Sequence, residues 1–321
     1  MVMNQTGAAG CLAGKAIVIT GAGRGLGAAY ARLAASEGAR VVVNDIDEAA
    51  ASTVARDITE RGGQAFAEGS DISSWDGAAA LVAACIERYG GLDGLVNNAA
   101  LFHMAGPDAE DEGTLRALIS VNLFGTAFCG IHALRHMIPR QRGAIVNITS
   151  GAQAGSSLQG IYGASKGAVA SLTYSWAIDA AVHGIRVNAF SPMARTHMAD
   201  KAKAYLLAHD RKPWPELSST PEDNAPVVVF LLSDHALGVH GQVLRLDGGR
   251  LSLMTHPAVL HPPIQHSSGT VEDVRAAWDG HLQAHQLPLG VVATDWCTQS
   301  YDLPYSRQGD GSGAPAGACA T

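Results

Sequence analysis

The stretch KAIVITGAGRGLG, residues 15–27, decides the fold because it places a glycine-rich turn between a short β-branched run and a helix-like segment. Residues 15–20 predict a strand, and residues 25–38 predict a helix with one apolar face. Glycines let the chain turn tightly, and the first turn of the following helix presents free N–H groups to an anion. The stretch therefore predicts the phosphate-binding turn of a dinucleotide-binding sheet; by itself, such a loop is also compatible with a plain turn.

An acidic residue ends the next predicted strand. Asp45 lies 18 residues after Gly27, close to the roughly 20 residues expected for the carboxylate that binds an adenosine ribose. A carboxylate accepts hydrogen bonds from both ribose hydroxyls and repels a 2′-phosphate, so Asp45 favours NAD over NADP. Arg24 would offset this preference if it reached a 2′-phosphate, and the alternative for Asp45 is a solvated turn residue.

Apolar strand-like runs alternate with helix-like stretches from residue 15 to about residue 249. Strands that are apolar on both faces and separated by helices predict a parallel sheet covered on two sides. The predicted fold class is α/β, a Rossmann-type doubly wound parallel sheet with helices on both faces, in one domain with a C-terminal extension. One long helix is predicted over about residues 114–138, ended by Pro139.

Four segments follow from these patterns: an N-terminal tail at 1–13, an NAD-binding catalytic domain at 14–250, a C-terminal extension at 251–300, and a tail at 301–321. The extension shows little periodicity at first. Thr270, with Asp273 three residues later, then predicts the start of one helix. The last segment is rich in Gly, Ser, Pro and Ala, and we expect it to be disordered.

The composition and charge of the chain argue against some classes of binding partner. The chain has 321 residues with 22 basic and 29 acidic side chains, a formal net charge of −7, and a hydrophobic fraction of 47%. These values exclude a mainly disordered chain and argue against nucleic acid as a partner. No apolar run approaches the roughly 18 residues of a membrane span, and residues 1–14 lack a signal-peptide pattern, so we expect no membrane partner.

The cysteines and histidines are scattered. An odd number of widely spaced cysteines favours a reducing compartment, and we expect the cytoplasm. No CxxC or HExxH pattern is present, and prolines interrupt the five-residue spacing of His256, His261 and His266. We therefore expect no metal site.

The sequence YGASK, residues 162–166, places a phenol and an ammonium group four residues apart, on one face of a helix. Tyrosine titrates near ~10, and a nearby cation lowers that pKa towards the range of a useful base. Ser150 closes the predicted strand AIVNITS, at the carboxyl edge where doubly wound sheets bind ligands. This arrangement predicts an acid/base site.

Taken together, these motifs resemble the short-chain dehydrogenase/reductase family over about residues 14–250. The matching positions, in the order of the family, are the glycine loop TGAGRGLG, Asp71, Asn97-Asn98-Ala99, Asn122, Ser150, Tyr162, Lys166, the strand IRVNAFSP and Asp247-Gly248-Gly249.

The resemblance implies an oxidoreductase that uses NAD to interconvert a secondary alcohol and a ketone by hydride transfer. It implies that Tyr162 transfers the proton, that Lys166 binds the nicotinamide ribose and lowers the Tyr162 pKa, that Ser150 orients the substrate oxygen, and that Asn122, in the long helix, holds a water in a proton relay. Cofactor contacts are implied for Gly21, Gly23, Arg24, Gly25, Leu26, Gly27, Asp45, Asp71, Ile72, Asn98, Ala99, Tyr162, Lys166, Pro192, Met193 and Thr196.

Three positions depart from the family pattern. Ala100 stands where glycine is usual, and Met193 replaces the glycine after Pro192, so the lid that begins there should pack differently. In the family, the serine more commonly lies 13 residues before the tyrosine. Here Ser150 lies 12 residues before Tyr162, and Thr149 lies 13 residues before it. Thr149 therefore stays an alternative to Ser150.

The stretches SPMARTHM and GQVLRLDGGRLSLM further resemble the (3R)-hydroxyacyl-CoA dehydrogenase unit of multifunctional enzymes and its bacterial relatives. The family forms a lid from residues 196–220, where Tyr205, Leu206, Leu207 and Trp214 suggest an apolar substrate such as a hydroxyacyl thioester or a hydroxysteroid. The alternative for these residues is a surface helix that buries them against the sheet.

Other functions of the same fold stay open. They are the reduction of a cyclic or terpene-like ketone, epimerisation or dehydration, and a non-catalytic NAD-binding regulatory role. The family's two long helices also form subunit interfaces, which implies a homodimer or a homotetramer.

Overall fold

The computed structural model describes residues 10–259, 270–285 and 290–291. The chain divides into two compact units, Met1–Met254 and Thr255–Thr321. The tails predicted at 1–13 and 301–321 lie mostly or wholly outside the described residues.

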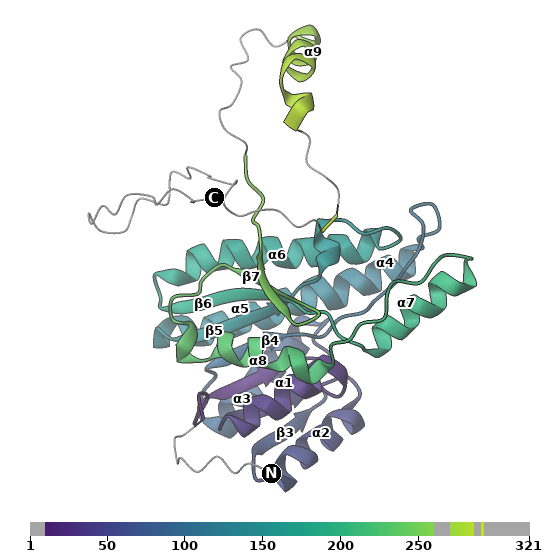
Figure 1. The fold of residues 1–321 in the computed structure, drawn as a ribbon. Coiled ribbons are helices and arrows are strands. Elements are labelled where there is room, and N and C mark those ends of the chain that lie inside the picture. The colour runs from purple at the N-terminus through teal and green to yellow at the C-terminus, as the bar shows by residue number, and fades with distance from the viewer. Residues whose placement is uncertain (1–9, 260–269, 286–289, 292–321) are drawn as a thin grey trace, which may run out of the picture. The chain divides into compact units, whose positions relative to one another are not determined.

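One eight-stranded sheet runs through the first unit in the order β3-β2-β1-β4-β5-β6-β7-β8 (Figure 1). All neighbours pair in parallel except β7 and β8. The strands are β1 (Ala16–Ile19), β2 (Arg40–Asn44), β3 (Gln64–Glu68), β4 (Gly94–Asn97), β5 (Gly143–Ile148), β6 (Ile185–Ser191), β7 (Val243–Asp247) and β8 (Arg250–Met254). The predicted doubly wound α/β fold is confirmed, and the strand order reverses between β1 and β4, which places a ligand crevice at their carboxyl ends.

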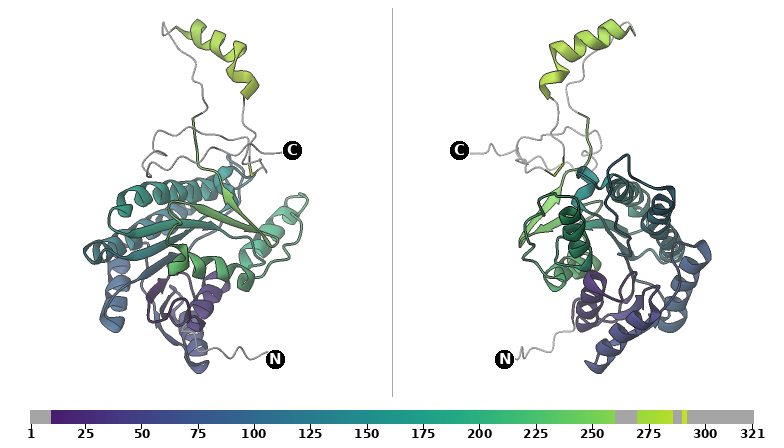
Figure 2. Two further views of the ribbon diagram at one scale, coloured as in Figure 1. Left: turned by 60° about the vertical axis from the view of Figure 1, so that its left-hand side comes forward. Right: turned by 90° about the vertical axis from the view of Figure 1, so that its right-hand side faces the viewer.

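Helices cover both faces of this sheet (Figure 2). The α-helices of the first unit are α1 (Gly25–Ser36), α2 (Glu48–Glu60), α3 (Trp75–Tyr89), α4 (Glu112–Ile119), α5 (Thr126–Met137), α6 (Gly160–Ala181), α7 (His197–Ala208) and α8 (Pro221–Leu232). A π-helix, Ser120–Gly125, joins α4 to α5, and short 3₁₀ helices lie at Ile138–Arg140, Gly151–Ala154 and Asp234–Ala236.

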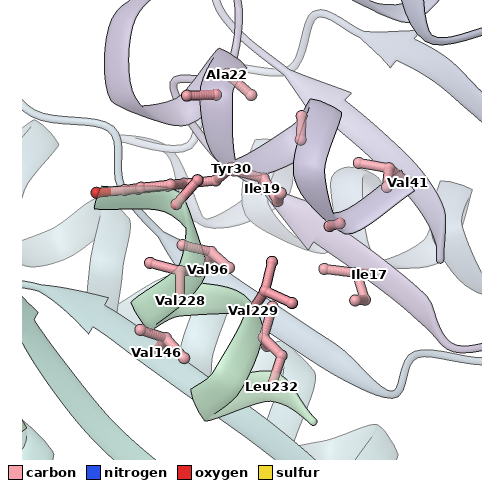
Figure 3. Packing of buried hydrophobic residues seen from close by; sticks show 14 of the residues in the cluster. Ile17, Ile19, Ala22, Tyr30, Val41, Val96, Val146, Val228, Val229 and Leu232 are labelled. Carbon is pink, nitrogen blue, oxygen red and sulfur yellow. The ribbon is translucent and has the colours of Figure 1, made fainter. Parts of the chain in front are cut away.

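Two apolar clusters hold these layers together. In the first, α1, α2 and α8 pack on one sheet face, where Tyr30, Ile17 and Leu232 are almost fully buried (Figure 3). In the second, α3, α5 and α6 pack on the opposite face. Each fully buried aliphatic or aromatic side chain contributes about 1.5–3 kcal/mol relative to exposure, so helices are held against both faces of the sheet.

A close approach fixes α5 against α6. A Cβ atom at Gly130 on α5 would lie 2.3 Å from a ring carbon of Trp176 on α6. Only a residue without a side chain lets the indole ring sit against the α5 backbone, so Gly130 sets the distance between the two helices.

The long helix predicted over 114–138 corresponds to one helical run, Glu112–Arg140, whose middle is a π-helix rather than an α-helix. The π-helix contains Asn122, whose side chain is fully buried. The Asn122 side chain hydrogen-bonds both the backbone N–H and the carbonyl of Leu101. Such tertiary hydrogen bonds can favour an inserted residue that periodicity does not show.

The same helical run, Glu112–Arg140, is long and apolar enough to cross a membrane by length and composition alone. The sequence expectation that no stretch meets this test therefore needs correction. Cys129, Ala133 and Met137 of this run are buried in the cluster that covers the sheet.

Strand β8 is a further correction, because the sequence analysis found little periodicity at the start of the C-terminal extension and predicted no strand there. Gly248 and Gly249 have φ angles of 55° and 83° and join β7 to β8 as a two-residue hairpin turn. A Gly-Gly pair between alternating apolar residues is a strong hairpin signal. The first residue pair beside the turn joins Asp247 to Arg250.

The second unit contains helix α9 (Val271–Gly280) and a 3₁₀ turn at Leu282–His285. The predicted N-cap is confirmed: Thr270 and Asp273 form a capping box, in which each side chain meets the other residue's backbone. Residues 260–269, with His261 and His266, lie outside the described residues.

Candidate active site

The glycine loop between β1 and α1 is closed by contacts that leave no room for side chains. Gly21 has a φ of 60°, and a Cβ there would lie 2.7 Å from the Ala99 Cα atom. A Cβ at Gly27 would lie 2.3 Å from the Gly21 carbonyl oxygen. The Asn98 amide donates to the carbonyl oxygens of Thr20 and Gly21, each at 2.9 Å. Asn98 thus fastens the loop to the end of β4.

The N-terminus of α1 faces this loop without a side-chain cap. Its N-cap residue is Arg24, whose side chain makes no capping hydrogen bond. Uncapped N–H groups and the positive end of the helix dipole suit a pyrophosphate. The cradle of small residues and free donors therefore fits a dinucleotide cofactor.

Asp45 lies beside the same loop. Its carboxylate accepts hydrogen bonds from the Gly23 N–H at 3.0 Å and the Asp47 N–H at 3.1 Å. A Cβ at Gly23 would lie 2.9 Å from the Asp45 Oδ2 atom. The acidic group predicted from spacing is thus brought to the glycine loop, where an adenosine ribose would meet it.

The remaining predicted cofactor residues lie at ends of neighbouring strands. After β3, Asp71 accepts a hydrogen bond from the Ser73 N–H, and Ile72 is buried near Gly125. After β6, the Met193 carbonyl accepts from Asn224 at 3.1 Å. Three further residues were predicted to contact the cofactor: Leu26, Pro192 and Thr196. Leu26 packs against the first apolar cluster and Thr196 is the N-cap residue of α7. The cofactor contacts of all three residues stay predictions.

Tyr162 is buried near the start of α6 and interacts with Ser150. Burial raises the pKa of Tyr162, while a hydrogen bond with the Ser150 side chain acts to lower it. The Thr149 hydroxyl instead donates to the Phe190 carbonyl at 3.2 Å, within the sheet. Of the two alternatives left open by spacing, the structure therefore brings Ser150 to the phenol.

Lys166 lies one helical turn after Tyr162 and is buried. Burial lowers the pKa of its ammonium to about 8. Its Nζ atom donates to the Ile148 carbonyl at 2.8 Å and lies 6.0 Å from the centre of the Tyr162 ring. A positive charge this close favours the phenolate, but burial is the largest influence on the Tyr162 pKa, so the expected lowering by Lys166 stays a prediction.

Asn122 supports α6 from the π-helix. Its side-chain amide donates to the Ser165 hydroxyl at 3.0 Å, and the Thr126 hydroxyl donates to the Asn122 backbone carbonyl at 2.8 Å. Ser165 lies next to Lys166, so the π-helix is tied to the helix turn that carries the buried ammonium. A relay water at Asn122 stays a prediction.

An apolar wall continues from Tyr162 towards α7. Phe102 packs edge-on against the Tyr162 ring, with 5.0 Å between ring centres. Phe102 also belongs to a cluster with Met104 and Leu206 of α7. Of the predicted lid residues, Leu206 and Tyr205 join this cluster, whereas Leu207 is 56% exposed. Their contact with an apolar substrate stays a prediction.

A pocket of about 390 Å³ lies beyond this wall. Its lining combines the apolar side chains of Leu158, Leu206 and Trp214 with the cations Arg211 and Lys212. Serines 156 and 157 complete it. The sequence analysis missed both cations because no motif surrounds them; their place after a lid helix was the only available signal.

Gln153 was also missed. It lies in the 3₁₀ turn after Ser150, and its amide nitrogen donates to the Met254 sulfur at 3.6 Å. Its amide oxygen is buried without a hydrogen-bond partner among the described residues. Strand β8 therefore reaches the loop that separates Ser150 from Tyr162.

Known proteins resemble this chain over most of its length. Residues 21–250 match the family model described as Enoyl-(Acyl carrier protein) reductase. The chain is 41% identical over 237 residues to cis-4-hydroxycyclohexanecarboxylate dehydrogenase of Sinomonas cyclohexanicum, covering 72% of this chain and 94% of that protein.

Two solved structures are similar to this one as well. A short chain dehydrogenase from Mycobacterium avium superposes with a TM-score of 0.76 at 33% identity, covering 87% of this chain and 98% of that one. A gluconate 5-dehydrogenase from Burkholderia cenocepacia J2315, in complex with NADP and tartrate, gives a TM-score of 0.66 at 32% identity, covering 74% and 95%.

The chain belongs to the short-chain dehydrogenase/reductase family. It is an NAD(P)-dependent oxidoreductase that acts on CH–OH groups, interconverting a secondary alcohol and a ketone.

Proposed function

We propose that this protein oxidises a cyclic secondary alcohol with NAD, using Tyr162 as the acid/base group. The observation that carries this proposal is the buried Tyr162 phenol, hydrogen-bonded to Ser150 and one helical turn from the buried Lys166 ammonium. The cyclic class is supported by the relative named for cis-4-hydroxycyclohexanecarboxylate. A second relative, 38% identical, is named as a 2,5-dichloro-2,5-cyclohexadiene-1,4-diol dehydrogenase, from Sphingobium indicum.

Each residue has a separate task in the oxidation. The Ser150 hydroxyl donates a hydrogen bond to the substrate oxygen and holds it beside the phenol. The Tyr162 phenolate takes the hydroxyl proton as the C=O bond forms. The bound cofactor supplies the hydride acceptor. Lys166 stabilises the phenolate with its positive charge.

The preference for NAD rests on Asp45. A 2′-phosphate beside this carboxylate would add unfavourable charge repulsion, whereas two ribose hydroxyls would donate to it. Arg24, at the N-cap of α1, makes no ion pair with a described carboxylate. If the protein preferred NADP, Arg24 would be the cation that binds the 2′-phosphate.

The Tyr162→Phe variant tests the proposed function. We expect loss of alcohol oxidation by at least ~100-fold, the lower range for removal of a general acid/base group, with NADH binding unchanged by fluorescence. Tyr174→Phe, on the same helix, is the matched control and should keep full activity. Turnover retained by Tyr162→Phe would exclude Tyr162 as the acid/base group.

We further infer that the protein works as a homodimer or homotetramer in the cytoplasm. Helix α6 leaves Ile178 and the following Val182 76% and 80% exposed, and exposed apolar side chains on one surface are typical of interfaces. The free thiols of Cys85 and Cys129, both buried, suit a reducing compartment. Light scattering after size-exclusion chromatography measures the oligomeric state, and a monomer would contradict the interface.

A further inference from the structure

Met193 follows Pro192 where the family usually has glycine, and its side chain is held by a residue of strand β7. The Arg245 guanidinium donates to the Met193 sulfur at 2.8 Å. Strand β6 lies between β5 and β7 in the sheet, so this contact turns the Met193 side chain towards β7. Ser150 follows β5, so the thioether points away from the serine.

Arg245 is fixed in turn by two other partners. Its side chain is 12% exposed, and its guanidinium donates to the Ser191 hydroxyl at 3.1 Å and to the Asp247 carboxylate at 3.1 Å. Ser191 is fully buried at the end of β6 and pairs directly with Arg245 in the sheet. A guanidinium carries its donors in a rigid fork, so one group can hold three neighbours. Arg245 therefore reaches Met193 from a fixed position.

The Met193 backbone is held independently of Arg245. Its carbonyl accepts a hydrogen bond from the Asn224 amide at 3.1 Å, and Asn224 is fully buried in α8. Two residues after Met193, the Arg195 N–H donates to the Ser219 carbonyl at 2.9 Å. Loss of the Arg245 contact would consequently release the methionine side chain and leave the surrounding backbone in place.

A released methionine side chain would reach the space beside Ser150. Ile148 pairs with Phe190 across β5 and β6, and the Thr149 N–H donates to the Phe190 carbonyl at 2.8 Å. Continued by two residues, this parallel register brings Ser150 opposite Pro192, and neighbouring strands lie only about 5 Å apart. Methionine is unbranched and rotates about three bonds, so it adapts to the space that is open to it.

We propose that Arg245 is a positioning residue, which keeps the Met193 side chain out of the space where the nicotinamide ring meets the alcohol. This inference rests on the proposed function, because it places the reacting carbon beside Ser150 and Tyr162. A glycine has no side chain to hold, so the departure from the family pattern at Met193 makes the contact necessary. Without Arg245, the methionine competes with the nicotinamide end of the cofactor. The adenosine end, at Asp45, is unaffected.

Titrations with two nucleotides separate the two ends of the cofactor. NADH carries the nicotinamide ring, whereas ADP-ribose has the adenosine, the pyrophosphate and the second ribose without this ring. We expect Arg245→Met to weaken NADH binding by about 3- to 10-fold, as for one hydrogen bond, and ADP-ribose binding by less than about twofold. Arg250→Met replaces an exposed arginine on β8, removes the same charge and should change neither affinity. Calorimetry measures both nucleotides.

A cycle of single and double substitutions tests whether Arg245 acts through Met193. The Met193→Ala background has no long side chain to release, so Arg245→Met should lower its NADH affinity by less than about twofold. Equal losses in both backgrounds would overturn the proposal. Unaltered NADH binding in Arg245→Met, or equal losses of NADH and ADP-ribose binding, would overturn it as well.

Arg245→Lys provides the same test if Arg245→Met does not fold. Its ammonium keeps the charge beside Asp247, but a single ammonium lacks the fork that holds three neighbours. We expect weaker binding of NADH and unchanged binding of ADP-ribose, with the difference removed by Met193→Ala. The outcomes that overturn the proposal are the same as for Arg245→Met.

Steady-state kinetics gives a second readout. Saturating NAD displaces the methionine side chain, so Arg245→Met should raise KM for NAD by about 3- to 10-fold and leave kcat within about twofold of the wild type. A fall in kcat at unchanged KM would overturn the proposal, because the loss would then lie in a later step than cofactor binding.

The two proposals fail in different ways. The nucleotide titrations need no turnover and can be repeated in Tyr162→Phe. Retained turnover in Tyr162→Phe contradicts the acid/base role and leaves the titration result standing. Normal Tyr162 chemistry, with equal effects of Arg245→Met on NADH and ADP-ribose binding, overturns the positioning role alone.

Discussion

Single residues in this site combine burial with charge. Lys166 is a buried cation whose ammonium donates to one backbone carbonyl, and Asp45 is a buried carboxylate that accepts two backbone N–H groups. Sequence spacing predicted both residues. Lys166 lies one helical turn after Tyr162, and Asp45 ends a strand at the distance from the glycine loop expected for a ribose-binding carboxylate. Arg211 and Lys212, which line a pocket after α7, were not singled out, because no motif surrounds them.

Replacement of Asp45 by serine should change cofactor preference. We expect Asp45→Ser to weaken NADH binding by about 10- to 100-fold, the range for a charged hydrogen bond, and to strengthen NADPH binding because the repelling charge is gone. Asp47→Ser removes the same charge two residues later and keeps a good N-cap residue for α2. Fluorescence titration of both variants with both cofactors measures this. Unaltered NADH affinity in Asp45→Ser would remove the basis of the NAD preference.

The buried Lys166 should make stability depend on pH. Its pKa is about 8 in the folded protein, against 10.5 as the ordinary value. Between these values the unfolded chain binds more protons than the folded chain, so stability rises with pH. We expect the free energy of unfolding to increase by up to about 1.4 kcal/mol per pH unit over this window, relative to Lys166→Met. Urea titrations at pH 8 and pH 9.5 measure the slope; parallel pH dependence in both proteins would contradict a depressed pKa.

At the level of helices and strands, periodicity predicted most elements but missed the π-helix and β8. The π-helix follows from hydrogen bonds between Asn122 and residues distant in the sequence, which no local pattern encodes. Strand β8 did have a local signal, the Gly248-Gly249 pair. The sequence analysis interpreted this pair only as part of the family motif and not as a hairpin turn. The distance between α5 and α6 could not be predicted either, because it depends on Gly130 meeting one particular indole ring.

Two glycine-to-alanine substitutions should therefore act in opposite directions. Gly130→Ala places a methyl group against Trp176 and should destabilise the protein by about 1–3 kcal/mol, as overpacking does. Gly167→Ala on α6 meets no atom closer than 3.9 Å, and should stabilise it by about 0.5–1 kcal/mol through helix propensity. Denaturant unfolding monitored by circular dichroism measures both. Equal effects of the two substitutions would show that the α5–α6 contact relaxes.

Over the whole molecule, the first unit contains both apolar clusters and every residue of the candidate site. The boundary at Met254 falls just after β8, whereas the sequence analysis placed the end of the catalytic domain at 250. The difference arises because β8 completes the sheet. Helix α9 was predicted correctly at its start from the capping pattern alone.

A chain that ends at Met254 should accordingly fold and bind cofactor by itself. We expect the same unfolding midpoint to within about 2 °C and the same NADH affinity, because a loss of 1 kcal/mol in a protein of this size shifts the midpoint by roughly 2–4 °C. Calorimetry on the full chain and on residues 1–254 measures this, and residues 1–249, which lack β8, serve as the comparison. An unstable 1–254 chain would show that residues 255–321 contribute to the fold.

The length of the turn between β7 and β8 determines which side chain of β8 lies beside Gln153. Side chains alternate between the two faces of a strand, so Met254 lies on the opposite face from Leu251 and Leu253, which are 59% and 62% exposed. One residue inserted at Gly248-Gly249 would slip the pairing register and exchange those faces. A leucine would then replace the Met254 sulfur beside Gln153, next to Ser150 and Tyr162. An insertion or deletion at this distant surface turn would thus reach the reacting groups without altering any residue among them.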